Sequence, residues 1–160
     1  WQIKNNKYKD MKTIILILSL FLSLGCNNSD PQTPFQSTEI TFTEIGKGAL
    51  FGNGVENISQ TSLLINNQTE WQNLMNQMDS VNNISDTFPE TNIDFETYSI
   101  VAVFLEIKGS GWEVVINTII ENENNITISI QETEFVSTVI TQPFHIVKIP
   151  KTTKEIVTEQ

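Results

Sequence analysis

The stretch Ser99–Ile107, which reads S-I-V-A-V-F-L-E-I, decides the fold. Its apolar residues occupy both odd and even positions, so an extended chain here would bury both of its faces. Such a segment belongs in the middle of a sheet, with a helix covering one face. The neighbouring stretches must supply that helix and the other strands.

Further strand patterns follow this stretch. Trp112–Ile120 comes after a short Gly109-Ser110-Gly111 link, which we interpret as the tight turn of a hairpin. Ile126–Gln131 alternates isoleucines with polar residues, as a half-buried strand does. Pro143–Ile149 predicts another strand, with its proline at the beginning, where a missing N–H is tolerated.

The strongest helix signal begins at Thr69. Thr69 and Gln72 fit a capping box, in which each side chain satisfies a backbone N–H of the first turn. Four apolar residues then recur at helical spacing and form one stripe: Trp71, Leu74, Met75 and Met78. We therefore predict one amphipathic helix, at about residues 70–79, that packs on the sheet.

Two shorter strand candidates, Glu39–Ile45 and Thr61–Asn66, precede the helix. Between them, Gly46–Gly54 carries four of the seven glycines and predicts a loop. Strands, one helix and then a meander of strands are typical of an α+β fold with a mainly antiparallel sheet.

The composition limits the possible functions. The chain has 160 residues, of which 39% are hydrophobic, enough for one core. Its 9 basic residues are all lysines and face 19 acidic ones, for a net charge of −10, so a nucleic-acid backbone would repel it. With 1 Cys and 1 His, neither a disulfide framework nor a His/Cys metal cluster can form.

The residues from Met11 onward have the order of a secretory signal: Lys12, an apolar run over Ile14–Leu24, then Gly25-Cys26. The run has about 11 residues, fewer than the roughly 20 that a transmembrane helix needs. Leu22–Cys26 resembles a bacterial lipobox, in which the cysteine is acylated. We predict lipidation at Cys26; the alternative is an ordinary signal peptide with an incidental cysteine.

This interpretation divides the chain. We expect residues 1–10 to lie upstream of the true start and 11–25 to be a lipoprotein signal peptide. Residues 26–34 would be a lipidated tether, and 35–160 a single α+β domain. The protein is then exported and attached to the envelope of a Gram-negative bacterium, at its outer membrane, through acyl chains on Cys26.

Three stretches resemble the PrcB-type C-terminal domain, a family of bacterial exported lipoproteins named for a subunit that partners a surface protease. They are Ile93–Phe95, residues 101–116 and Thr141–Pro150, and the similarity covers about residues 93–156. Ser110-Gly111-Trp112-Glu113 stands where the family has a Gly-Gly pair followed by Tyr or His. The resemblance implies a non-enzymatic accessory role toward a partner protein.

Few residues suggest a catalytic or metal-binding site. His145, the only imidazole, lies between Phe144 and Ile146, so we interpret it as a structural strand residue. Asp94 with Glu96 could form a carboxylate pair for glycoside hydrolysis, and Glu121 with Glu123 could hold Ca²⁺ weakly, but both pairs are typical of solvated turns. We predict no catalytic residue, no metal site and no cofactor.

The candidate contact surface centres on Trp112, because exposed aromatic residues are enriched where proteins bind partners. Its predicted members are Gly109, Ser110, Gly111, Trp112, Pro143 and Phe144. We expect a protein partner, with a protease as one candidate. Two alternatives stay open: a carbohydrate- or small-ligand-binding module, and a proteinase inhibitor whose 109–112 turn enters an active cleft.

Overall fold

A computed structural model describes residues 33–52, 54–109 and 111–159. Residues Phe35–Gln160 form a compact unit. The predicted α+β class is confirmed, since 49% of the chain is strand, mostly antiparallel, and the described residues contain one α-helix. The predicted leader, tether and Cys26 lie outside the described residues, except for Thr33 and Pro34.

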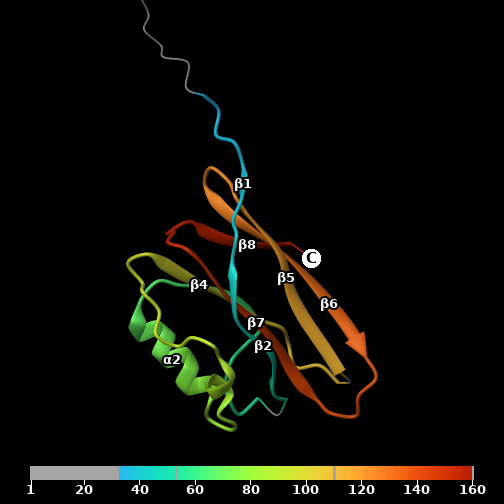
Figure 1. Cartoon of the computed structure of the whole chain (residues 1–160). Helices are drawn as coiled ribbons and strands as arrows, with labels where there is room; N and C mark the ends of the chain where they lie inside the picture. Colours follow the sequence, from blue (N-terminus) through green and yellow to red (C-terminus); the bar gives the residue numbers. More distant parts are fainter. Residues whose placement is uncertain (1–32, 53, 110, 160) are drawn as a thin grey trace, which may run out of the picture. The chain divides into compact units, whose positions relative to one another are not determined.

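The strands form two four-stranded sheets (Figure 1). Sheet A has the order β1-β5-β6-β8 and sheet B the order β2-β7-β4-β3. All pairings are antiparallel except the parallel one between β6 and β8. The bounds are β1 Thr38–Glu39, β2 Thr43–Phe51, β3 Thr61–Ile65, β4 Tyr98–Phe104, β5 Gly111–Glu121, β6 Asn125–Phe135, β7 Thr141–Pro150 and β8 Glu155–Glu159.

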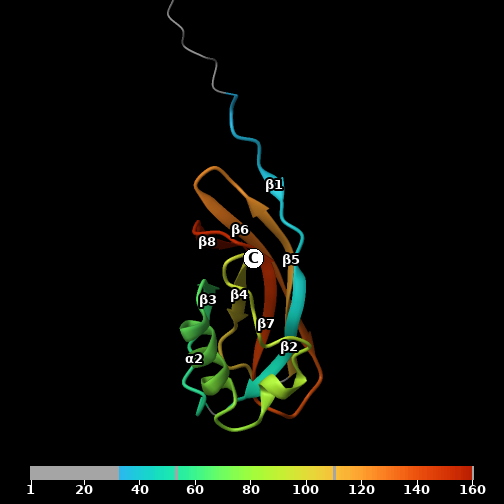
Figure 2. The ribbon, with the colours of Figure 1, turned by 60° about the vertical axis from the view of Figure 1, so that its left-hand side comes forward.

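The helix α2, Gln68–Met78, covers sheet B on the side away from β5 (Figure 2). The predicted stripe is confirmed, because its four apolar residues, Trp71, Leu74, Met75 and Met78, are all buried. The predicted cap is wrong: Asn67 is the N-cap, and its side chain accepts the Glu70 N–H at 2.9 Å. The helix therefore begins at Gln68, one residue before the predicted cap Thr69. A short 3₁₀ helix, η1, follows at Ile84–Thr87.

Strand β4 is buried on both faces, as its sequence predicts. Ile100, Ala102 and Phe104 belong to the core that includes the helix stripe. Val101, Val103 and Leu105 belong to a second core, between the two sheets, with isoleucines of β5 and β6. The apolar run therefore supplies two hydrophobic cores, which stabilise the fold by burying apolar surface.

Two sequence predictions about connections are wrong. β4 and β5 form no hairpin, because they belong to different sheets. Because β4 has apolar side chains on both faces, sheet B must be covered on both sides, by the helix on one and by sheet A on the other. The predicted loop Gly46–Gly54 is largely strand β2, paired with β7. Gly46 is needed there for close packing rather than a turn, because the Phe88 ring occupies the space of a Cβ.

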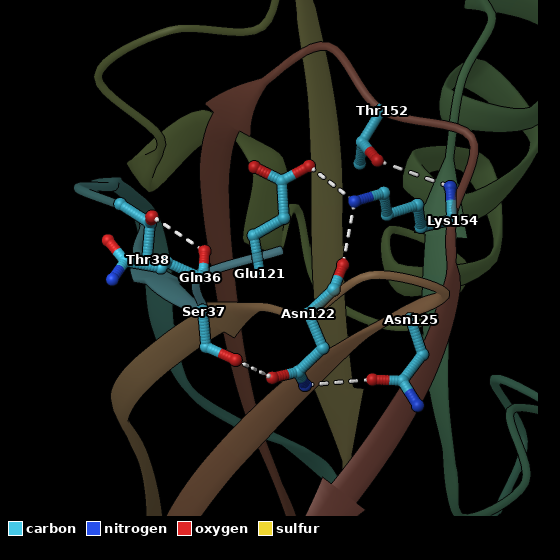
Figure 3. Close-up of polar contacts among 8 residues, drawn as sticks. All are labelled: Gln36, Ser37, Thr38, Glu121, Asn122, Asn125, Thr152 and Lys154. Carbon is cyan, nitrogen blue, oxygen red and sulfur yellow. Dashed lines mark hydrogen bonds and ion pairs between the residues drawn. The ribbon is translucent and has the colours of Figure 1, made fainter. Parts of the chain in front are cut away.

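The chain enters the compact unit beside the β5–β6 turn. Thr38 of β1 pairs with Glu121 at the end of β5, and Ser37 Oγ donates to Asn122 Oδ1 at 2.7 Å (Figure 3). Lys154 Nζ donates to Asn122 O at 2.7 Å and pairs with Glu121 at 2.8 Å. We call this region, residues 36–39 and 121–125 with Lys154, the entry end.

No helix among the described residues is both long and apolar enough to span a bilayer.

Candidate functional site

The structure separates the residues of the predicted contact surface. Gly109 is exposed, whereas Pro143 and Phe144 are buried. Phe144 packs against Phe104 and Phe88, with ring centroids 6.0 and 6.4 Å away. The prediction that Pro143 and Phe144 are contact residues is therefore corrected. The reason is that β7 is a central strand between β2 and β4, and its apolar side chains, Phe144 among them, lie in the two cores.

The glycine turn is also less open than predicted. Gly111 is buried, and the Phe135 ring occupies the space where a Cβ would lie. Trp112 is half-buried, with Lys108 Nζ 4.5 Å from its ring centroid. An ammonium at that distance attracts the electron-rich face of the indole. Ser110 lies outside the described residues.

Lys108 is held by two carboxylates as well as by this ring. Its Nζ lies 3.2 Å from Glu106 Oε1 and 3.2 Å from Glu132 Oε2. Desolvation disfavours the Lys108 charge, but hydrogen bonds and attraction from Glu132 and Glu106 outweigh it and raise the pKa of Lys108. We call Glu106, Lys108, Trp112 and Glu132 the Lys108 cluster.

A polar pocket of about 680 Å³ adjoins the Lys108 cluster. Three side-chain amides, two carboxylates, one ammonium and one apolar side chain line it: Gln60, Asn117, Gln131, Glu106, Glu132, Lys108 and Ile130. Such walls offer hydrogen bonds to a polar group.

Exposed apolar side chains gather at the same end of the sheets. Seven of the ten exposed large hydrophobics of the described residues come from three segments: the end of β2 with the connection to β3, the β4–β5 crossover, and the end of β6 with the connection to β7. They are Phe51, Val55, Ile107, Phe135, Val136, Val139 and Ile140. We call these seven the apolar end. Val136 is 101% exposed and the other six are 45–57% exposed.

Strand pairing brings these segments together. Phe51 pairs with Thr141, directly after Ile140, and Phe135 pairs with Gly111. The Ile107 side chain lies within 3.3 Å of the place where Gly54 would carry a Cβ. Single exposed hydrophobics are normal, but a contiguous group of them marks an interaction site. Sequence reasoning missed it, although residues 135–140, F-V-S-T-V-I, contain four large apolar residues and no charge.

His145 connects the two sheets and is 2% exposed. Its Nδ1 accepts the Ile116 N–H of β5 at 2.8 Å, so the neutral ring carries its proton on Nε2, which lies 3.2 Å from Glu44 Oε2. The register shifts at both contact points, between Glu44 and Gly46 in β2 and between Ile116 and Thr118 in β5. Both bulges thus meet at the His145 ring, which fits the structural role expected of it.

Burial lowers the pKa of His145, and the charge of Glu44 offsets this only in part. The neutral ring is the form that Ile116 requires, because a protonated Nδ1 could not accept its N–H.

The other chemical candidates have structural partners. Asp94 accepts the Thr97 hydroxyl at 2.8 Å and the Glu96 N–H at 3.1 Å, and these hydrogen bonds lower the pKa of Asp94. Glu121 pairs with Lys154, and Glu123 is exposed. Residues 33–52, 54–109 and 111–159 contain no group of three or more His, Cys, Asp or Glu arranged to hold a metal ion.

The chain matches no protein-family model, no curated protein and no solved structure. The resemblance to the PrcB-type domain and the lipidation of Cys26 therefore stay predictions.

Proposed function

We propose that this chain is a lipid-anchored interaction protein of the bacterial cell envelope, an accessory or stabilising partner of another exported protein. The apolar end carries this proposal, because seven exposed large hydrophobics gather where three segments meet. A protease is the partner class that the PrcB-type resemblance implies.

The position of the apolar end supports this role. β5 has 11 residues, with Gly111 beside the apolar end and Glu121 at the entry end. At about 3.3 Å per residue, the two ends lie about 33 Å apart. A chain tethered through Cys26 would enter at β1 and present the apolar end at the opposite end of β5.

The test is capture of the partner from membranes of the native host by the intact chain. Val136→Ser with Val139→Ser removes apolar surface at exposed positions. We expect this variant to capture at least about tenfold less of the partner than the unaltered chain does. Val81→Ser with Val157→Ser is the matched control, because both positions are exposed but lie outside the apolar end. Equal capture by all three forms would contradict the proposal.

The anchor is tested separately by growing the native host with a clickable fatty acid. The intact chain should become labelled, and Cys26→Ala should abolish the label. Unchanged labelling of that variant would contradict lipidation at this residue.

The polar pocket favours one alternative function, binding of a carbohydrate or another small polar ligand. Its amide and carboxylate groups are those that bind hydroxyls, and Trp112 of the adjoining cluster would report on binding through its fluorescence. Saturable quenching by an oligosaccharide, lost in Asn117→Ala, would favour this alternative. The inhibitor alternative has less support, because Gly111 is buried and Trp112 lies beneath Lys108 rather than projecting from the turn.

A further inference from the structure

Acidic residues lie in the chain segments that supply the apolar end. Glu106 precedes Ile107, and Glu132 and Glu134 precede Phe135 on the same strand. These segments, residues 51–52, 54–55, 106–108 and 132–140, contain these three acids and one base, Lys108. Three acids against one base give these segments a negative net charge. The one base, Lys108, is already paired with Glu106 and Glu132.

Two of these carboxylates are open to a partner. The Glu106 side chain is 62% exposed and contacts Lys108 through Oε1. Glu134 is exposed, and within the described part of the chain no salt bridge involves it. The Lys108 cluster illustrates what such groups bind here, since it holds an ammonium between two carboxylates and an indole face.

This charge pattern selects among the possible occupants of the apolar end. Anionic lipid headgroups would meet like charge, which disfavours a bilayer. A second copy of the chain would bring two acidic borders together, which disfavours self-association. A protein surface with basic residues around an apolar centre would complement both the apolar side chains and the carboxylates.

We infer that the apolar end binds an exported protein whose contact face is apolar and bordered by lysine or arginine. This inference rests on the proposed function and adds the chemistry of the partner. The apolar residues would supply most of the buried surface, while Glu106 and Glu134 would steer the encounter and exclude partners with an acidic border.

The experiment is zero-length carbodiimide cross-linking of the intact chain in native-host membranes, followed by mass spectrometry. Carbodiimide joins a carboxylate to an amine, so we expect Glu106 or Glu134 to be linked to a lysine of the partner. Glu106→Gln with Glu134→Gln should reduce capture about three- to tenfold at low salt, and raising the salt should weaken capture by the unaltered chain. Glu96→Gln with Glu123→Gln, two exposed acids elsewhere, is the matched control.

The outcomes separate the two proposals. Capture that is lost in Val136→Ser/Val139→Ser but unchanged by salt and by the Glu106/Glu134 variant overturns this inference and leaves the proposed function intact. Capture of no exported protein by the unaltered chain overturns both. Saturable binding of Cys26→Ala to phosphatidylglycerol vesicles through Val136, or a concentration-dependent dimer abolished by Val136→Ser/Val139→Ser, would assign the apolar end to another occupant and overturn the inference.

Discussion

The two ends of the β5–β6 hairpin differ in the side chains that they expose. At the entry end, side chains and backbone groups satisfy one another, with Asn122 contacting Ser37, Asn125 and Lys154 (Figure 3). At the other end, Phe135 and Val136 leave the hairpin with their side chains exposed. A fold gains nothing from exposing such surface to water. The difference indicates that the entry end serves the structure and that the apolar end serves recognition.

The largest effect on stability should come from Phe144, a buried residue of β7. Phe144→Ala should lower the free energy of unfolding by about 3–5 kcal/mol, because it leaves a cavity between Phe104 and Phe88. Chemical denaturation would measure the loss. A change below about 1 kcal/mol would instead place Phe144 at the surface and enlarge the apolar end.

A pH-dependent loss should follow from the His145 link between the sheets. Because burial lowers the pKa of His145, the unfolded chain binds the proton more readily than the folded one. Its contribution to stability is therefore complete above about pH 6.5, the usual pKa of a histidine, and is lost as the pH falls below that value. One such group changes the free energy of unfolding by at most about 1.4 kcal/mol per pH unit.

Denaturation midpoints between pH 5 and 8 would test this contribution. His145→Asn offers an acceptor to the Ile116 N–H without titrating, so its stability should depend less on pH than that of the unaltered chain. Other groups that face the ring, Glu44, Lys47 and Glu113, are the same in both proteins. Identical pH profiles would contradict the assigned role.

A smaller effect is expected at the entry end. Asn122→Ala removes the side-chain hydrogen bonds to Ser37, Asn125 and Thr127 and should cost about 1 kcal/mol, because the region is largely exposed. Partner capture should be unchanged. Loss of capture in a chain that remains folded would show that the entry end also takes part in recognition.

The smallest effect on stability is expected at the apolar end. Val136→Ser with Val139→Ser should change the free energy of unfolding by less than about 0.5 kcal/mol, because both side chains are exposed. Thermal unfolding against the Val81→Ser/Val157→Ser control would measure it. A loss above about 2 kcal/mol would mean that the two valines support the fold.

Local patterns predicted much of this fold. The doubly apolar β4, the alternating β6 and the stripe of α2 each bury the residues that periodicity indicates. The pairing of segments that are distant in sequence could not be predicted from such local patterns. The glycines of β2 indicated a loop because the sequence does not reveal that the Phe88 ring will lie against Gly46. The parallel strand β8 escaped prediction for the same reason, since its alignment depends on β6.

The candidate site was predicted only in part. The sequence indicated the end of the sheets where Gly109 and Trp112 lie, because an aromatic residue directly after a glycine turn is a candidate for partner contact. It did not show that Pro143 and Phe144 are buried, which depends on β7 lying between β2 and β4. Nor did it show that the segments of Phe51, Ile107 and Ile140 are neighbours, because these segments are distant in sequence and come together at Thr141 through strand pairing.

Site-specific photo-cross-linking in the native host is the most direct test of the apolar end as the contact surface. A benzophenone amino acid would replace Val136 in one protein and Val157 in another, two exposed valines that differ in location. We predict a discrete cross-link to one exported protein from position 136 and none from position 157. No product from position 136, or the same product from both positions, would contradict the account.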